Sequence, residues 1–258
     1  MKNISILGSG WLGLPLARHF VSEGYSVKAS TTSEGRLPEI RSAGAESFLL
    51  NLNELNHTIK PFLDASILIV NIPSKNIAGF QQFVKEVDAS AIEYAIFVSS
   101  TSVYKNVRRT ITELDTNYFS DSPLLEIEEL FQTCRSIKTT VVRFGGLIGY
   151  SRHPGRFFKP GRIVPNPDAP VNLIHRDDCI GIISQIVAQQ VWGEVLNCCA
   201  DTHLTKREFY SRAVESIGGI LPEFGEADPT IGKTISNQKV KQVLNYRFKY
   251  PDLMKVEL

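Results

Sequence analysis

The sequence lacks an excess of charge of either sign. Its 258 residues include 28 lysines and arginines against 27 aspartates and glutamates, which leaves a formal net charge of +1. Proteins that bind nucleic acids or acidic membrane surfaces usually carry a strong positive field or a basic patch. Neither a nucleic acid nor a membrane is therefore expected as a partner.

Cysteine and long apolar runs are also scarce. The cysteines Cys134, Cys179, Cys198 and Cys199 show no CxxC spacing, and the adjacent pair suits neither zinc nor an ordinary disulfide. No uncharged apolar run approaches the roughly 18 residues of a membrane-spanning helix. Glycines interrupt the first apolar stretch before a signal-peptide core could form. We expect no metal site, reduced thiols and a cytoplasmic location.

What the sequence does contain is a repeated alternation of short apolar runs and amphipathic segments. Apolar runs predict buried strands, and the segments between them predict helices of about ten residues. In chain order the expected elements are a strand at 4–7, a helix from residue 12, strands at 25–31 and 46–52 around a helix at 37–43, strands at 66–72 and 94–99 around a helix at 79–88, a helix at 124–135 and a strand at 139–144. Such alternation predicts an α/β fold, a doubly wound parallel sheet of the Rossmann type.

The remainder predicts a smaller lobe. Residues 149–170 are rich in proline and glycine, which break regular structure, and Thr205 to Glu208 matches a capping box ahead of a helix. We assign residues 1–150 to a dinucleotide-binding domain, to which residues 171–200 return. Residues 151–170 and 201–258 are assigned to a small C-terminal substrate lobe.

The first βα turn carries a phosphate-binding pattern. Residues 8–13 read GSGWLG, which fits GxGxxG, follows a predicted strand and opens a predicted helix. Glycines permit a tight turn and close approach of the backbone to a ligand, while a helix N-terminus attracts phosphate. The alternative is a simple strand-to-helix turn. The residues expected to hold a pyrophosphate are Gly8, Gly10, Trp11, Leu12 and Gly13.

The end of the second predicted strand indicates which dinucleotide binds. NAD sites usually place an acidic residue about 20 residues after the glycines, where it accepts hydrogen bonds from the ribose. This sequence has Thr31, Thr32 and Ser33 there, with Arg36 close behind. Hydroxyls and a guanidinium suit a 2′-phosphate, so NADP is predicted, with NAD as the alternative. Arg36 could equally open an exposed helix.

Residues 98–104, VSSTSVY, follow the strand at 94–99 and place four consecutive hydroxyl residues at its carboxyl end. This run resembles the strand-end motif of the extended short-chain dehydrogenase/reductases, the NAD-dependent epimerase/dehydratase family. The segments RFGGLIG at 143–149, NLIHRDD at 172–178 and GEVLN at 193–197 are similar to later segments of that family. The resemblance spans nearly the whole chain.

The resemblance implies roles for individual residues. Ser100 matches the hydroxyl that orients the substrate oxygen, with Ser99 beside it on the cofactor side. Asn71, Ile72 and Pro73 end a strand that borders the adenosine half of the cofactor. Family members often dimerise through helices that flank the central strands, so the resemblance makes a homodimer an option.

The sequence departs from the family at its catalytic pair. The family uses YxxxK, a tyrosine acid/base and a lysine that lowers its pKa, and this sequence contains no YxxxK. Ser120 and Leu124 stand where the pair is expected. Tyr118 and Tyr104 are the candidate substitutes, although an unassisted tyrosine has a pKa near 10, too high for efficient proton transfer at neutral pH.

Two functions are consistent with these observations. The first is an NAD(P)-dependent oxidoreductase or epimerase that acts on a hydroxyl or carbonyl of a small molecule, for which the resemblance suggests a nucleotide sugar. The second is a non-catalytic NADP(H)-binding redox sensor or regulatory protein, which the missing YxxxK favours. The hydroxyl run at 99–102 favours the enzyme, because a sensor has no need of it.

Overall fold

The computed structural model describes residues 3–158 and 161–256, and the chain divides into two compact units. The first unit comprises Met1–Ser99, Ser122–Val142 and Ile180–Val195, and the second comprises Ser100–Asp121, Arg143–Cys179 and Leu196–Leu258. Each unit is therefore assembled from three separate stretches of the sequence.

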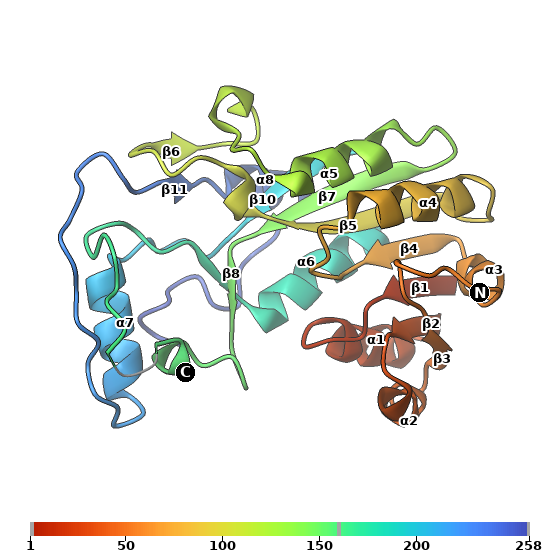
Figure 1. The fold of residues 1–258 in the computed structure, drawn as a ribbon, viewed down its shortest axis with the longest axis horizontal. Helices are drawn as coiled ribbons and strands as arrows, with labels where there is room; N and C mark the ends of the chain where they lie inside the picture. The colour runs from red at the N-terminus through yellow and green to blue at the C-terminus, as the bar shows by residue number, and fades with distance from the viewer. Residues whose placement is uncertain (1–2, 159–160, 257–258) are drawn as a thin grey trace. The chain divides into compact units, whose positions relative to one another are not determined.

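A seven-stranded sheet with the strand order β10-β7-β5-β4-β1-β2-β3 forms the centre of the fold (Figure 1). Its strands are β1 (Asn3–Leu7), β2 (Ser26–Thr31), β3 (Glu46–Leu49), β4 (Ile67–Val70), β5 (Tyr94–Ser100), β7 (Lys138–Phe144) and β10 (Val195–Cys198). β1 pairs in parallel with β2 and β4, β2 with β3, and β4 with β5. The order reverses at β1, which confirms the predicted doubly wound sheet.

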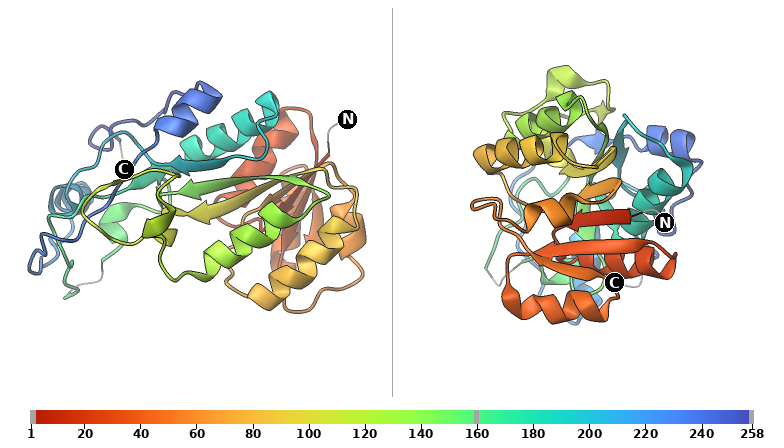
Figure 2. Two further views of the ribbon diagram at one scale, coloured as in Figure 1. Left: turned by 90° about the horizontal axis from the view of Figure 1, so that it is seen from above. Right: turned by 90° about the vertical axis from the view of Figure 1, so that its right-hand side faces the viewer.

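Helices cover both faces of this sheet. They are α1 (Gly13–Ser22), α2 (Leu37–Ser42), α3 (Ile59–Leu63), α4 (Ile77–Asp88), α5 (Pro123–Thr133) and α6 (Arg176–Gln189). Figure 2 shows α4 and α5 on one side of the strands and α1 and α6 on the other. His19 on α1 and Ser184 on α6 are hydrogen-bonded at 3.0 Å, which fixes these two helices side by side.

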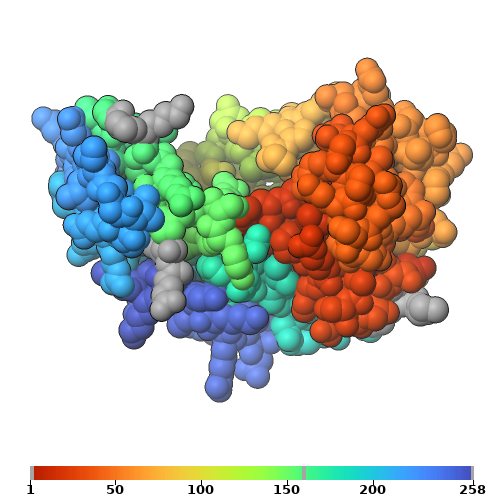
Figure 3. Space-filling view, turned by 90° about the horizontal axis from the view of Figure 1, so that it is seen from below, coloured from red at the N-terminus to blue at the C-terminus, as the bar shows by residue number. Residues whose placement is uncertain are grey.

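The core of the first unit lies between β4, β5 and the helices α4 and α5. All four residues of β4 are buried, as a continuous apolar run in a parallel sheet predicts. Phe80 on α4 and Phe97 on β5 both contact the ring of Phe131 on α5, with ring centroids 6.0 and 5.2 Å apart. The space-filling view of Figure 3 shows one face of the molecule, on which the N-terminal part of this unit is red and orange.

The second unit contains two small parallel sheets and two helices. β8 (Gly146–Ile148) pairs with β9 (Leu173–His175), and β6 (Thr110–Ile111) pairs with β11 (Thr234–Ile235). The helices are α7 (Lys206–Glu215) and α8 (Gln238–Leu244). The capping box expected at Thr205 is present, with Glu208 as its reciprocal partner. Residues 159–160, which fall in the predicted proline-rich loop, lie outside the described residues.

The buried carboxylate of Asp178 ties the C-terminal segment into the second unit. It accepts hydrogen bonds from the backbone N–H groups of Lys249 (2.7 Å) and Tyr250 (3.0 Å) and from the hydroxyl of Tyr246 (2.9 Å). Three donors compensate the cost of burying this carboxyl. Among residues 3–158 and 161–256, no helix is both long and apolar enough to cross a membrane.

Candidate functional site

The glycine loop begins where β1 ends, and β2 holds it in shape. The N–H of Gly8 donates to Ser30 Oγ at 3.0 Å, and the N–H of Ser9 donates to the Ser30 carbonyl at 2.8 Å. Gly8 has a φ of +96°, and a Cβ placed there would lie 2.4 Å from the side chain of Ile72. Both the backbone conformation and the neighbour therefore require glycine.

The other two glycines of the loop have different surroundings. A Cβ on Gly13 would lie 1.9 Å from the carbonyl oxygen of Gly8, so this glycine lets α1 pack closely against the strand end. A Cβ on Gly10 would meet nothing within 4 Å, so the space outside this glycine is open. These are the roles that dinucleotide sites give to the third and second glycines of the motif.

The N-terminus of α1 is suited to an anion. Its N-cap, Leu12, makes no side-chain capping bond, and the first turn has no acidic residue. The first N–H groups of a helix have no partner within the helix and carry a partial positive charge. The hydroxyl of Ser9, in a residue only 2% exposed, also lacks a hydrogen-bond partner among the described residues. These donors fit a pyrophosphate.

A pocket of about 430 Å³ opens beside this loop. Its lining includes Gly8, Gly10, Thr31, Thr32, Arg36, Asn71, Ile72 and Pro73, all of which the sequence predicted as cofactor contacts. The lining also includes residues 50–53, which the sequence reasoning missed although they directly follow β3. Carboxyl ends of parallel strands meet at one edge of a sheet, and this rule would have found them.

Arg36 is the charged residue of the pocket lining. Its Nη2 donates to the Ser9 carbonyl at 2.9 Å, and its Nε donates to the Glu39 carboxylate at 3.2 Å. The side chain is 40% exposed and can reach a ligand. At the end of β2 the hydroxyl of Thr31 accepts the N–H of Ser33 at 3.2 Å. No aspartate or glutamate is among the described residues that line the pocket.

The remaining predicted cofactor residues do not line the pocket. These are Trp11, Leu12, Gly13, Ser33 and Ser99. Leu12 and Gly13 are buried at the start of α1 and shape the loop. Ser99 is 6% exposed, and its hydroxyl donates to the buried carboxylate of Glu128 on α5 at 2.5 Å. Cofactor contacts for these five residues stay predictions.

In the second unit, Ser100 begins a tight turn, the 3-10 helix η2 (Thr101–Val103). Its hydroxyl accepts the N–H of Ser102 at 3.1 Å. Ser120 donates to the carbonyl of Val103 at 3.0 Å. The resemblance to the short-chain dehydrogenase/reductases places their tyrosine at this position. In the first unit Leu124 lies in the first turn of α5, the position where the same resemblance places the lysine. Neither position carries a titratable group.

The hydroxyls of Tyr104 and Tyr118 both form hydrogen bonds with other side chains. The Tyr104 hydroxyl accepts from Arg143 Nη1 at 2.6 Å and donates to Asn197 Oδ1 at 3.0 Å, in a residue 2% exposed. Burial raises the pKa of Tyr104. The Tyr118 hydroxyl accepts from Arg109, whose guanidinium lies 4.4 Å from the ring centroid. Catalysis by either tyrosine stays a prediction.

His175 is packed in the second unit. It is 5% exposed, and its ring centroid lies 3.9 Å from that of Tyr250. Burial lowers the pKa of His175, although the carboxylate of Asp177 opposes the shift. The imidazole is therefore held largely neutral at physiological pH, as a structural role requires.

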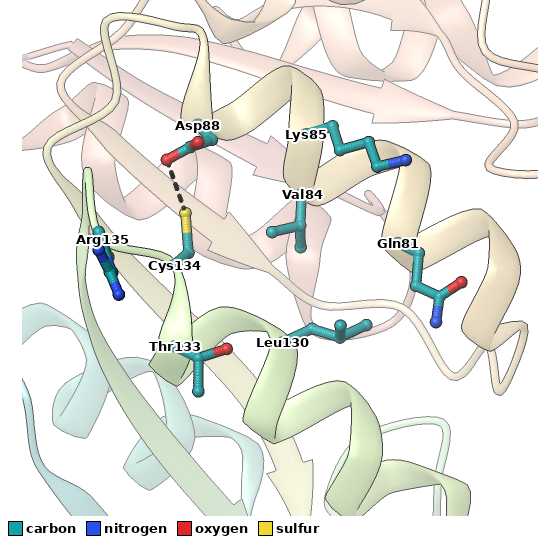
Figure 4. Close-up of a pocket in the computed structure, with 8 residues that line it drawn as sticks. All are labelled: Gln81, Val84, Lys85, Asp88, Leu130, Thr133, Cys134 and Arg135. Carbon is teal, nitrogen blue, oxygen red and sulfur yellow. Dashed lines mark hydrogen bonds between the residues drawn. The ribbon is translucent and has the colours of Figure 1, made fainter.

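A second pocket, of about 480 Å³, lies between α4 and α5 (Figure 4). Val84 and Leu130 form its apolar side, and the thiol of Cys134 donates to the Asp88 carboxylate at 3.4 Å. Burial and the neighbouring carboxylate raise the pKa of Cys134, so its reactive thiolate is disfavoured. Its lining includes neither the glycine loop nor the first turn of α1.

A curated relative matches nearly the whole length of the chain. Protein YeeZ of Escherichia coli strain K12 is 32% identical over 270 residues, which span 98% of this chain and 97% of that protein. The chain belongs to the YeeZ protein family. No family model matches the chain.

Solved structures with the same fold are more distant in sequence. A short-chain dehydrogenase/reductase superfamily protein from Agrobacterium tumefaciens with bound NAD is 15% identical, with a TM-score of 0.78 over 98% of this chain and 94% of that one. UDP-glucuronic acid 4-epimerase from Bacillus cereus, in complex with UDP-glucuronic acid and NAD, is 18% identical, with a TM-score of 0.78 over 96% and 94%. The predicted resemblance to this superfamily is confirmed, at the level of the fold.

Proposed function

We propose that the chain is an NADP(H)-dependent oxidoreductase that acts on a hydroxyl or carbonyl group of a small polar substrate. The observation that carries the proposal is the pocket lined by Gly8, Gly10 and Arg36, at the loop from which α1 begins without a side-chain cap. The two structural neighbours described above contain NAD. The first unit has the same kind of fold, which supports a nicotinamide dinucleotide as the ligand.

The choice of NADP rests on the ribose side of the pocket. Its lining holds two threonines and Arg36 and no carboxylate that could accept bonds from a 2′-hydroxyl. A guanidinium binds phosphate oxygens through charge-assisted, often bidentate hydrogen bonds. Arg36, Thr31 and Thr32 would hold the 2′-phosphate, while Gly10 and the first turn of α1 would hold the pyrophosphate.

The chemistry follows from the cofactor. A bound nicotinamide transfers hydride to or from a substrate carbon. Ser100 would hold the substrate oxygen, since its hydroxyl can donate outward while it accepts the N–H of Ser102. The Bacillus cereus neighbour binds UDP-glucuronic acid, so nucleotide sugars are the first substrates to screen.

The test is a titration of the purified protein with NADPH and, separately, with NADH. Trp11 lies in the glycine loop and reports binding through energy transfer to the dihydronicotinamide. A hydrogen bond to a charged group contributes about 1.5–3 kcal/mol, so Arg36→Ala is expected to weaken NADPH binding about 10- to 150-fold. NADH affinity should change little, because NADH has no 2′-phosphate.

Arg41→Ala is the matched control. Arg41 is an exposed arginine on the same helix, α2, bonded to Ser47 and absent from the pocket lining. Its removal should leave both affinities unchanged. Equal losses for NADPH and NADH in Arg36→Ala would mean that Arg36 shapes the loop through the Ser9 carbonyl and does not read the phosphate.

The second candidate function is an NADP(H)-binding sensor without catalysis. Ser120 and Leu124 stand at the positions where the resemblance places the tyrosine and lysine of the short-chain dehydrogenase/reductases. This observation favours the sensor. Tight NADPH binding with no turnover of carbonyl substrates would support the sensor. Turnover that falls in a Ser100→Ala variant would support the enzyme.

A further inference from the structure

A lysine from the C-terminal part of the chain contacts the turn that carries Ser100. Lys233 Nζ donates to the carbonyl of Thr101 at 2.8 Å and to the carbonyl of Tyr104 at 2.6 Å. Both acceptors belong to the hydroxyl-rich segment that follows β5 in the second unit. An ammonium has three donors, so two are used to hold this turn and the third is available to another acceptor.

The backbone around Lys233 is fixed on both sides. The side-chain amide of Asn172 donates to the Lys233 carbonyl at 2.9 Å and accepts the N–H of Ile235 at 2.7 Å. The N–H of Lys233 donates to Asn106 Oδ1 at 3.3 Å. Directly after the lysine, β11 pairs with β6. These contacts hold the lysine at one place against the turn, as an active-site group requires.

Among the described residues, the ammonium of Lys233 forms no ion pair with a carboxylate. Its partners are the neutral carbonyls of Thr101 and Tyr104, and the groups that hold its backbone, Asn106 and Asn172, are amides. The lysine is partly buried, and burial alone lowers the pKa of Lys233 to about 8. A group that titrates near 8 can donate and accept protons at physiological pH, whereas an ordinary lysine cannot.

We propose that Lys233 is the proton-transfer group of this chain, in the role for which the sequence offers no YxxxK. The inference rests on the proposed function and names the missing acid/base of the same reaction. Lys233 lies against the turn of Ser100, the residue proposed to hold the substrate oxygen, and it is the amine that the described hydrogen bonds bring to this turn.

In the reducing direction, a bound nicotinamide would supply the hydride for the substrate carbonyl carbon, and the electron pair of the C=O π bond would move to oxygen. The Lys233 ammonium gives that oxygen a proton, so an N–H bond breaks as an O–H bond forms. The carbonyl would be reduced to an alcohol, with the dihydronicotinamide as the two-electron reductant, and the neutral amine would regain a proton from water.

The first test needs neither cofactor nor substrate. An amine-acylating reagent is applied in short pulses across pH 6–11, and the modified Lys233 peptide is quantified by mass spectrometry. Only the neutral amine reacts, so the rate reports the titration of this lysine. A half-maximal rate near pH 8 is expected, and a half-maximal rate above pH 10 would overturn the proposal.

The second test separates proton transfer from a structural role. Lys233→Arg keeps a positive donor beside the turn but cannot release its proton in this pH range. If Lys233 transfers the proton, turnover in this variant falls about 10²- to 10⁴-fold, since that is the usual contribution of a general acid. Wild-type turnover in the reducing direction is expected to fall above pH 8, as the ammonium loses its proton. This fall should be absent from the Lys233→Arg variant. If the lysine only holds the turn, arginine restores turnover and the proposal fails.

Two controls complete the design. Lys105→Met removes an exposed lysine next to the same turn and should leave turnover unchanged. Circular dichroism and NADPH titration of Lys233→Arg establish that the variant folds and binds cofactor. If wild-type protein binds no NADPH, the proposed function fails. If Lys233→Arg binds NADPH normally and is fully active, only the role of Lys233 fails.

Discussion

The glycines of the loop have different surroundings, so alanine substitutions at Gly10 and Gly13 should have different effects. Gly10→Ala adds a methyl group in open space, with no atom within 4 Å. Gly10 does not have a left-handed φ, so the fold should tolerate alanine. Replacing a glycine where its conformation suits alanine changes stability by about +0.4 to +1 kcal/mol. The same methyl group occupies the space through which a pyrophosphate must approach the backbone.

The expected loss of affinity follows from the bonds that the methyl group displaces. Losing one charge-assisted hydrogen bond from a loop N–H to phosphate costs about 1.5–3 kcal/mol, so the Kd for NADPH should rise about 10- to 150-fold. Gly13→Ala differs, because its methyl group would overlap the Gly8 carbonyl oxygen at 1.9 Å. Overpacking of this kind destabilises a protein by about 1–3 kcal/mol.

The assay combines urea unfolding, followed by circular dichroism, with NADPH titration. The expected pattern is a stability equal to or slightly above that of wild type with weak NADPH binding for Gly10→Ala, and lowered stability for Gly13→Ala. A Gly10→Ala variant that binds NADPH as tightly as wild type would refute the reasoning, because the pyrophosphate could then not lie against this loop.

Two further predictions concern buried groups. Ser99→Ala removes a hydrogen bond from the buried carboxylate of Glu128 and should lower the free energy of unfolding by about 1–3 kcal/mol in urea titrations, whereas the exposed Ser42→Ala should change it by less than about 0.5 kcal/mol. Lys233 has a folded pKa of about 8, below its unfolded value, so the unfolded state binds more protons between pH 8 and about 10.5. Wild-type stability should therefore rise relative to Lys233→Met as pH increases through that window; a difference that stays constant with pH would contradict the lowered pKa.

The sequence predicted the elements whose residues repeat a local pattern. The apolar runs at β1, β4 and β5 and the glycines after α1 and α2 define strands and helix ends from neighbours a few residues away. β3 ends at Leu49, earlier than the predicted residue 52, because residues 50–53 turn into the pocket lining. No prediction was made for α6, although it is one of the two helices on its face of the sheet. Its buried apolar residues Cys179, Ile182, Ile183, Ile186 and Val187 recur at intervals of three and four, which is the pattern of an amphipathic helix, so this signal was present in the sequence and was missed.

The site residues also divide into those that a local motif predicts and those that no local pattern marks. The glycine loop and the residues at the ends of β1, β2 and β4 could be predicted because a local motif and one topological rule place them at the same edge. Lys233 could not be predicted, because it meets Thr101 across 132 residues of sequence and the segment around it carries no motif. Its position depends on the amide of Asn172 and on the pairing of two-residue strands, which leave almost no pattern in a sequence.

The absence of YxxxK therefore has a limited meaning for function. The resemblance places Ser120 and Leu124 at the positions of the catalytic pair, but the reaction proposed at Ser100 would need only a titratable group near that residue. The turn after β5 has one, brought there by the C-terminal segment. If the pulse-labelling experiment gives a half-maximal rate near pH 8 and Lys233→Arg abolishes turnover, the enzyme has kept its chemistry with a lysine that enters from the opposite end of the chain.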